Sequence, residues 1–169
     1  MRTELAACGW LSVASGSFPF LALLYAALFG AFGTESPFFP SLLAQRGLSA
    51  QEIGIVLAAG TLMRLSTGPL VGMAADRLGT RRVLAGAAFG AGSLALLYLQ
   101  GAGFWTLLGV SMVHAVAVAP LNPLCDALAL NSSAKEGAFP YGWVRGVGSS
   151  AFIGGTIASG FLVATWGID

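Results

Sequence analysis

Apolar residues fill five long stretches of this chain, and short polar segments separate them. The stretches run over about residues 18–39, 52–75, 83–99, 104–130 and 144–166. A helix needs about 20 mostly apolar residues to cross the hydrocarbon core of a bilayer. The pattern therefore predicts an all-α fold, a polytopic bundle of five transmembrane helices within a domain covering residues 18–166.

Residues 1–17 precede the first span. Residues 5–17 are apolar, although Gly and Ser interrupt them, and Arg2 stands in front. A signal peptide begins in a similar way. Here the apolar stretch continues to Phe39 without a convincing cleavage site. We therefore expect residues 1–17 to form a cytoplasmic or interfacial lead-in.

The composition argues against a water-soluble enzyme, a nucleic-acid binder and a disordered chain. Only 9% of the 169 residues are charged and 56% are hydrophobic, whereas soluble domains carry about 25% charged residues. A net charge of +1 argues against nucleic acid as a partner. Cys8 and Cys125 form no Cys-x-x-Cys motif, and Ser, His and Asp lie at different depths in the predicted spans. We expect no metal, no cofactor and no enzymatic activity.

Basic residues are unevenly divided between the two ends of the predicted spans, which indicates orientation because cytoplasmic loops are enriched in Lys and Arg. With a cytoplasmic N-terminus, the outer side holds Arg46. The inner side then holds Arg2, Arg77, Arg81, Arg82, Lys135 and Arg145. The Gly/Ala-rich, Lys-poor composition is compatible with a bacterial inner membrane.

Glycine is abundant, with 24 residues. Small residues four apart let transmembrane helices approach closely. We expect close helix packing at three such pairs, which are Gly68/Gly72, Gly86/Gly90 and Gly142/Gly146.

The loop between the second and third spans reads Gly-Met-Ala-Ala-Asp-Arg-Leu-Gly-Thr-Arg-Arg from residue 72 to residue 82. It resembles the loop signature of the major facilitator superfamily (MFS), Gly-x-x-x-Asp-Arg-x-Gly-x-Arg-Arg. The matching positions are Gly72, Asp76, Arg77, Gly79, Arg81 and Arg82. We expect Gly72 to permit close packing, Gly79 to make a tight turn with positive φ, and the charged residues to anchor the loop and gate transport.

Residues 123–130, 141–145 and 148–149 are similar to the subgroup that includes phenylpropionate permeases and related sugar and nucleoside proton symporters. The resemblance implies secondary active transport of a small organic solute by alternating access, with protons as coupling partners and the lipid bilayer as surroundings. Such transporters have twelve spans in two six-helix halves. Five spans correspond to a truncated N-terminal half, so a missing C-terminal half is the implied partner. The alternative is a truncated membrane module that does not transport without a second half.

Charged groups inside spans are functional candidates, because each costs about 2.5–3.5 kcal/mol at a helix centre on insertion scales. Arg64 lies at the middle of the second span, where it could bind a substrate carboxylate or pair with Glu35 or an acidic residue of the missing half. Glu35, near the outer end of the first span, could couple protons or simply face water. His114 could relay protons or pack as a buried side chain, and Asn122 could line the cavity beside two prolines.

Asp126 and Arg145 lie toward the inner face, as the 76–82 loop does. We interpret these charges as a cytoplasmic network that holds one transport state closed and breaks in the other. Interfacial anchoring is the alternative.

Overall fold

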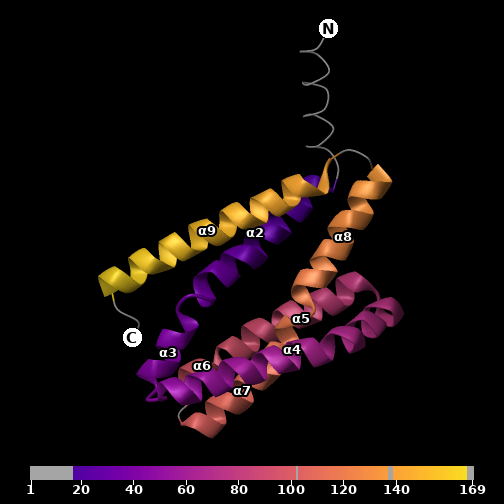
Figure 1. The fold of residues 1–169 in the computed structure, drawn as a ribbon. Helices are drawn as coiled ribbons and strands as arrows, with labels where there is room; N and C mark the ends of the chain where they lie inside the picture. Colours follow the sequence, from indigo (N-terminus) through magenta and orange to yellow (C-terminus); the bar gives the residue numbers. More distant parts are fainter. Residues whose placement is uncertain (1–16, 102, 137–138, 167–169) are drawn as a thin grey trace. The chain divides into compact units, whose positions relative to one another are not determined.

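The computed structural model describes residues 17–101, 103–136 and 139–166, and within them it contains helices and no strands (Figure 1). This confirms the predicted all-α class. The helices in chain order are α2 (Phe18–Glu35), α3 (Phe39–Gln45), α4 (Ala50–Leu78), α5 (Thr80–Ala95), α6 (Leu97–Gln100), α7 (Phe104–Val118), α8 (Leu121–Glu136) and α9 (Tyr141–Trp166). The predicted lead-in lies outside the described residues except for Ser17.

Five helical segments of the described chain are long and apolar enough to cross a membrane. Their bounds are Phe18–Gln45, Ala50–Leu78, Thr80–Gln100, Phe104–Ala134 and Tyr141–Trp166. The number agrees with the sequence, but several ends do not. The first segment continues as α3 after a turn at residues 36–38, where the sequence indicated a polar loop from residue 40. The third, fourth and fifth segments are also longer than predicted.

The second segment begins at Ala50, two residues before the predicted start, because Ser49 caps the helix. The Ser49 backbone N–H donates to Glu52 Oε2 at 2.8 Å, and the Glu52 backbone N–H donates to Ser49 Oγ at 3.4 Å. This reciprocal pair is a capping box, which satisfies two backbone groups that the helix start would otherwise leave unpaired.

Gly79 separates α4 from α5. Its φ of +91° is the conformation expected for this turn from the sequence, and its N–H donates to the Ala75 carbonyl at 2.9 Å. A residue with a Cβ is strained at such φ values. The glycine therefore allows α4 to end at Leu78 and α5 to begin at Thr80.

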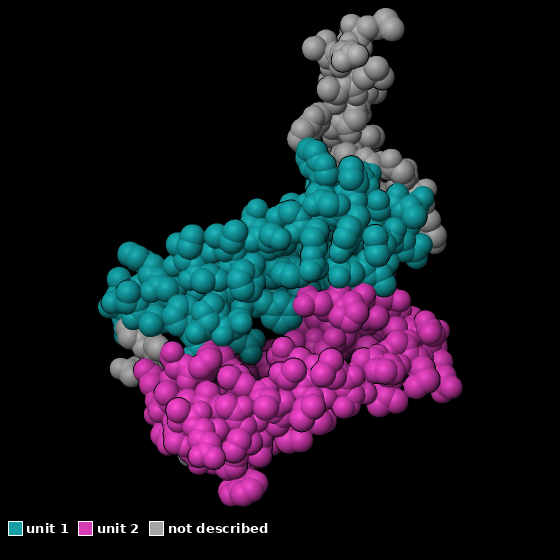
Figure 2. Space-filling view, viewed as in Figure 1, with its two compact units in different colours: residues 1–38, 125–169 teal, residues 39–124 magenta. Residues whose placement is uncertain are grey.

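The chain divides into two compact units (Figure 2). Unit 1 comprises residues 1–38 and 125–169, and unit 2 comprises residues 39–124. In unit 1, α2 and α9 lie side by side along their lengths (Figure 1). In unit 2, α7 packs against both α4 and α5. A buried apolar cluster of unit 2 consists of Leu43, Leu48, Val56, Tyr98 and Leu107.

Arg46 links two segments at one end of unit 2 by hydrogen bonds. Its guanidinium donates from Nη2 to the Leu99 carbonyl at 2.9 Å and from Nη1 to the Gly101 carbonyl at 3.4 Å. These carbonyls lie at the C-terminal end of α6, where a helix leaves acceptors without an intrahelical donor and where a cation is favourable. Arg46 thus ties the segment between α3 and α4 to the end of α6.

Glycine brings the backbones of α2 and α9 together. A Cβ at Gly33 would clash with the Phe152 backbone, and one at Gly155 would lie 2.5 Å from the Gly30 carbonyl oxygen. The Thr156 hydroxyl donates across this contact to the Gly33 carbonyl at 3.0 Å. Direct backbone approach of this kind is a common way for helices to associate in lipid.

The glycine pairs singled out from the sequence are not the sites of this close packing. A Cβ at Gly72 would meet no atom of the described chain within 4 Å, and one at Gly90 would make only an ordinary contact, 3.9 Å from the Ala117 Cβ. The same open space surrounds Gly68, Gly86, Gly142 and Gly146. Spacing alone did not identify the contact because it does not say which helix face meets a neighbour.

We predict that Gly155→Ala destabilises the chain by about 1–3 kcal/mol, since the added methyl would press on the α2 backbone. Gly154→Ala is the matched control, because a Cβ there meets nothing within 4 Å. That substitution should be neutral or stabilising by up to about 1 kcal/mol. Unfolding in mixed detergent micelles, followed by far-ultraviolet circular dichroism, measures both. Equal midpoints for the two variants would contradict the proposed contact.

Candidate functional site

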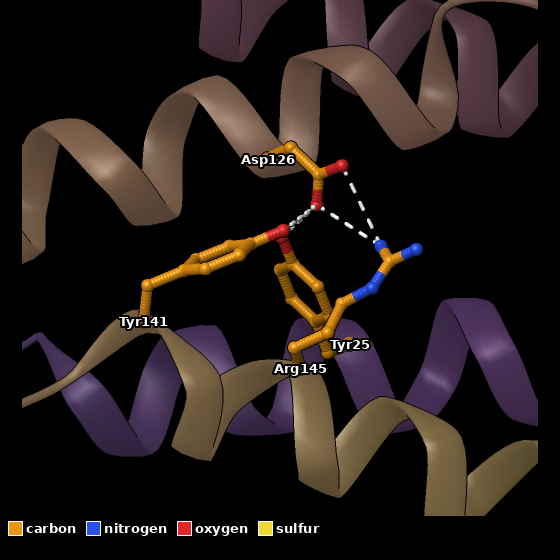
Figure 3. A network of polar contacts seen from close by, with 4 residues as sticks. All are labelled: Tyr25, Asp126, Tyr141 and Arg145. Atoms are coloured by element: carbon orange, nitrogen blue, oxygen red, sulfur yellow. Dashed lines mark hydrogen bonds and ion pairs between the residues drawn. The ribbon is translucent and has the colours of Figure 1, made fainter.

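Asp126 lies on α8 within unit 1, and its side chain receives donors from α2 and α9 (Figure 3). Asp126 Oδ1 accepts hydrogen bonds from Tyr25 Oη at 2.5 Å, Tyr141 Oη at 2.9 Å and Arg145 Nη1 at 3.2 Å. Arg145 Nη1 also lies 3.5 Å from Asp126 Oδ2. One carboxylate therefore joins three helices by charge-assisted hydrogen bonds, which are stronger than bonds between neutral groups.

The two donors on α9 share one face of that helix. Tyr141 and Arg145 are four residues apart, a spacing that places side chains one above the other. Tyr25, from α2, is fully buried. The hydroxyls of both tyrosines point at the same carboxylate oxygen (Figure 3), so the helical register of α9 and the burial of Tyr25 together fix the donor arrangement.

Phe29 adds a third aromatic ring to the site. The Arg145 guanidinium carbon lies 5.0 Å from the centre of the Phe29 ring, and the Phe29 and Tyr25 rings are stacked with centroids 5.6 Å apart. A guanidinium over a ring face gains a cation–π interaction. We refer to Tyr25, Phe29, Asp126, Tyr141 and Arg145 as the Asp126 cluster.

Gly148 makes room for the aromatic part of this cluster. A Cβ at Gly148 would lie 3.0 Å from Phe29 Cδ2 and 3.1 Å from Tyr25 Cδ1. Both rings therefore rest against the α9 backbone where that backbone carries no side chain. This is a glycine whose role is to admit neighbouring rings rather than another helix backbone.

The cluster lies in the part of unit 1 that contains the starts of α2 and α9. At a rise of about 1.5 Å per residue, Tyr25 is ~10 Å from the start of α2 and Arg145 is ~6 Å from the start of α9. By the same measure Asp126 is ~15 Å from the end of α8. These helix ends are the ones that the distribution of basic residues predicts to be cytoplasmic.

Both charged groups of the cluster retain access from outside the protein. The Arg145 side chain is 44% exposed and that of Asp126 is 32% exposed. A cation, a carboxylate and two phenols at one partly open position can exchange hydrogen bonds with an ionic or polar solute. The structure thus brings together Asp126 and Arg145, which the sequence placed at the same membrane face.

Arg64 and Glu35 lie in different units. Arg64 is at the centre of α4 in unit 2 and is exposed, whereas Glu35 is the last residue of α2 in unit 1. Asn122 is an exposed residue in the first turn of α8, on the unit 2 side.

His114 belongs to a buried group in unit 2. Its ring meets the Tyr98 ring edge-on at 5.6 Å, and the Tyr98 hydroxyl donates to Ser111 Oγ at 3.1 Å. All three side chains are at most 5% exposed. The surroundings of His114 are therefore those of a packed side chain with polar neighbours.

The 72–82 segment forms the last turns of α4, the Gly79 turn and the first turn of α5. Its charged side chains are exposed, and they are Asp76, Arg77, Arg81 and Arg82. It belongs to unit 2.

Among residues 17–101, 103–136 and 139–166, no group of three His, Cys, Asp or Glu residues is placed to hold a metal ion.

Sequence reasoning did not assign Tyr25, Phe29 or Tyr141 to a functional site, although Tyr141 lies in a segment that carries the family resemblance. A signal existed for Tyr141, because it lies four residues before Arg145 and so shares its helix face. A hydroxyl among the otherwise apolar residues 18–33 was the corresponding signal for Tyr25. Nothing comparable marks Phe29 among the 11 phenylalanines.

Comparison with known proteins agrees with this description. The model of the MFS_1 like family matches residues 19–169, so the chain belongs to this family of the major facilitator superfamily and is a multi-pass integral membrane protein of a transporter class. A relative from Escherichia coli (strain K12), named probable 3-phenylpropionic acid transporter, is 34% identical over 153 residues. The match covers 85% of this chain and 38% of the relative. No solved structure matches.

We predict that Tyr25 and Asp126 are energetically coupled. In a double-mutant cycle of Tyr25→Phe and Asp126→Asn, the double variant should lose about 0.5–3 kcal/mol less stability than the sum of the two single losses. Detergent-induced unfolding of the four chains gives the coupling. The same cycle with Tyr98→Phe in place of Tyr25→Phe should be additive, because Tyr98 bonds to Ser111 in the other unit. Additivity in both cycles would show that the Tyr25–Asp126 hydrogen bond does not stabilise the protein.

Proposed function

We propose that this chain supplies membrane helices of a secondary active transporter that moves a small organic acid by alternating access. Membership of the MFS_1 like family supports the transporter class. The observation that carries the proposal is the Asp126 cluster, because it is a polar contact among three helices on one side of the predicted span. Such a contact can hold one conformation closed and can be exchanged for water or solute in another.

In this proposal the cluster acts as a cytoplasmic contact. Asp126 holds α8 against donors of α2 and α9, and its release frees α8 from these two helices. The exposed charges at Asp76, Arg77, Arg81 and Arg82 act on the same side, where they anchor the α4–α5 turn in the polar interface. The N-terminus is cytoplasmic, and the membrane is a bacterial inner membrane.

Arg64 is our candidate for binding the substrate carboxylate. It is a charged residue at the centre of a helix long enough to span the bilayer, where the cost of insertion requires a polar surrounding or a partner. The relative's name, a phenylpropionic acid transporter, favours an aromatic acid. His114 and Asn122 are proposed to contribute to the polar pathway.

The proposal includes a second group of helices. The chain covers 38% of the matched relative, and substrate sites of secondary transporters built from repeats lie between the repeats near the bilayer midplane. We propose that transport requires a C-terminal half, with which this chain would enclose the site. A chain that only inserts and pairs, without moving solute, is the alternative.

Uptake of labelled 3-phenylpropionate tests this function. The chain is produced in cells alone and as a chimera followed by the remainder of the E. coli relative. We expect the chimera to accumulate the label. Arg64→Ala in the chimera should raise KM about tenfold or more, by loss of a charged contact to the carboxylate.

Immunoblots of membrane fractions control for protein level in both forms. A chimera that inserts normally and takes up no organic acid would refute the transport proposal. An Arg64→Ala chimera with unchanged KM would remove Arg64 from the substrate site.

Proton coupling is proposed to involve Glu35, which ends α2 opposite the end that carries the Asp126 cluster. Glu35→Gln keeps the shape of the side chain and removes its charge. We expect uptake by the Glu35→Gln chimera to lose most of its dependence on external pH, whereas the Glu52→Gln chimera, which changes a carboxylate in a helix cap, keeps that dependence. An unaltered pH profile for Glu35→Gln would assign coupling elsewhere.

A further inference from the structure

We propose that Phe29 is a positioning residue for Arg145, and that it holds the guanidinium in one place whether or not Asp126 is bonded to it. The inference deepens the proposed function and rests on it, because it concerns a contact that forms and breaks. The observation that supports it is that Arg145 has two partners of different kinds on different helices. One is the carboxylate on α8, and the other is a ring face on α2.

The two partners of Arg145 differ in how firmly their helices are attached to α9. Phe29 belongs to α2, which lies along α9 and approaches its backbone directly at Gly33 and Gly155. Asp126 belongs to α8, which has no comparable lengthwise contact with α9 in the described chain. When α8 moves away, Phe29 therefore remains beside Arg145.

The Phe29 ring is itself fixed on several sides. It stacks on Tyr25 with centroids 5.6 Å apart and an interplanar angle of 17°, and it meets the Phe32 ring edge-on at 6.1 Å. A Cβ at Gly148 would lie 3.0 Å from Phe29 Cδ2, so the ring rests on the α9 backbone. A ring held in this way presents one constant face, and that face carries the negative part of the ring quadrupole.

Arg145 gains from such a support because Asp126 alone constrains it weakly. Only Nη1 approaches the carboxylate, at 3.2 and 3.5 Å from the two oxygens. A contact through one nitrogen leaves the guanidinium plane free to turn, and the side chain is 44% exposed. The Phe29 ring, 5.0 Å from the guanidinium carbon, supplies a second point of contact. Together the two contacts fix the position of the guanidinium.

This support makes the Asp126 contact easier to form again after it breaks. An arginine side chain loses rotamer freedom when it pairs, and a group that is already held in place loses less of that freedom. Asp126 then returns to a cation that has not moved. Leucine at position 29 would fill much of the same space but has no ring quadrupole. Positioning and simple packing therefore give different results.

Nuclear magnetic resonance of the full chain in lipid nanodiscs, with isotope-labelled arginine, tests this role directly. A guanidinium over a ring face is shifted upfield by the ring current, and the Arg145 signal is the one that Arg145→Lys removes. We expect the upfield shift in the unmodified chain and in Asp126→Asn. It should be lost in Phe29→Leu and kept in Phe29→Tyr, which retains the ring. Loss of the shift in Asp126→Asn would overturn the inference.

A double-mutant cycle measures the energetic consequence. The coupling between Asp126→Asn and Arg145→Gln is determined from unfolding in mixed micelles, with and without Phe29→Leu. We expect Phe29→Leu to weaken the coupling by about two- to fivefold in the equilibrium constant. Phe20→Leu is the matched control, because this residue of α2 is 59% exposed, and it should change neither the coupling nor the Arg145 shift.

Equal coupling with and without Phe29→Leu would show that Phe29 only fills space, and would overturn the inference. Circular dichroism and size exclusion establish that each variant is helical and monodisperse, and Phe29→Met carries the same test if the leucine variant is not. Both measurements use this chain alone. They therefore decide the role of Phe29 separately from the uptake test of the chimera.

Discussion

The hydrocarbon core of a bilayer offers no hydrogen bonds, and this constraint governs every level of the structure. Backbone groups must be paired within the chain, which in a single bundle means helices. Hydroxyls inside the spans follow the same rule by donating to the carbonyl four residues earlier, as Thr61, Ser66 and Thr165 do. Charged groups are the hardest to satisfy, and Asp126 gathers three donors for one oxygen.

The same medium changes what holds two helices together. Lipid tails are as apolar as leucine, so burying leucine against leucine gives little drive for association. Close backbone approach and polar contacts contribute instead. In unit 1 both occur on the same pair of helices, since α2 meets α9 through Gly33 and Gly155 and also through the stacked rings beside Gly148. The Asp126 contact then adds α8 to a pair that is already well packed.

Much of the fold was predictable because apolar length and turn chemistry are local properties. The five spans follow from runs of apolar residues, and the turn at Gly79 follows from a glycine between charged residues. Helix ends were less predictable, because α3 resumes after a turn and the Ser49 cap starts α4 early. The contacts between helices were least predictable. Spacing shows which residues share a helix face, but it does not show which neighbouring helix that face meets. Asp126 and Arg145 were identified by their charge, whereas Tyr25 and Phe29 depend on how α2 lies against α9.

Arg46 shows that the number of basic residues in a loop differs from the positive charge that the loop presents to lipid headgroups. Its guanidinium donates hydrogen bonds to the carbonyls of Leu99 and Gly101, so fewer of its N–H groups are free to bind a lipid headgroup. The arginines of the 76–82 turn, in contrast, are exposed to their surroundings. Anionic headgroups would therefore find more exposed guanidinium at the α4–α5 turn than at the end of α4 beside Arg46.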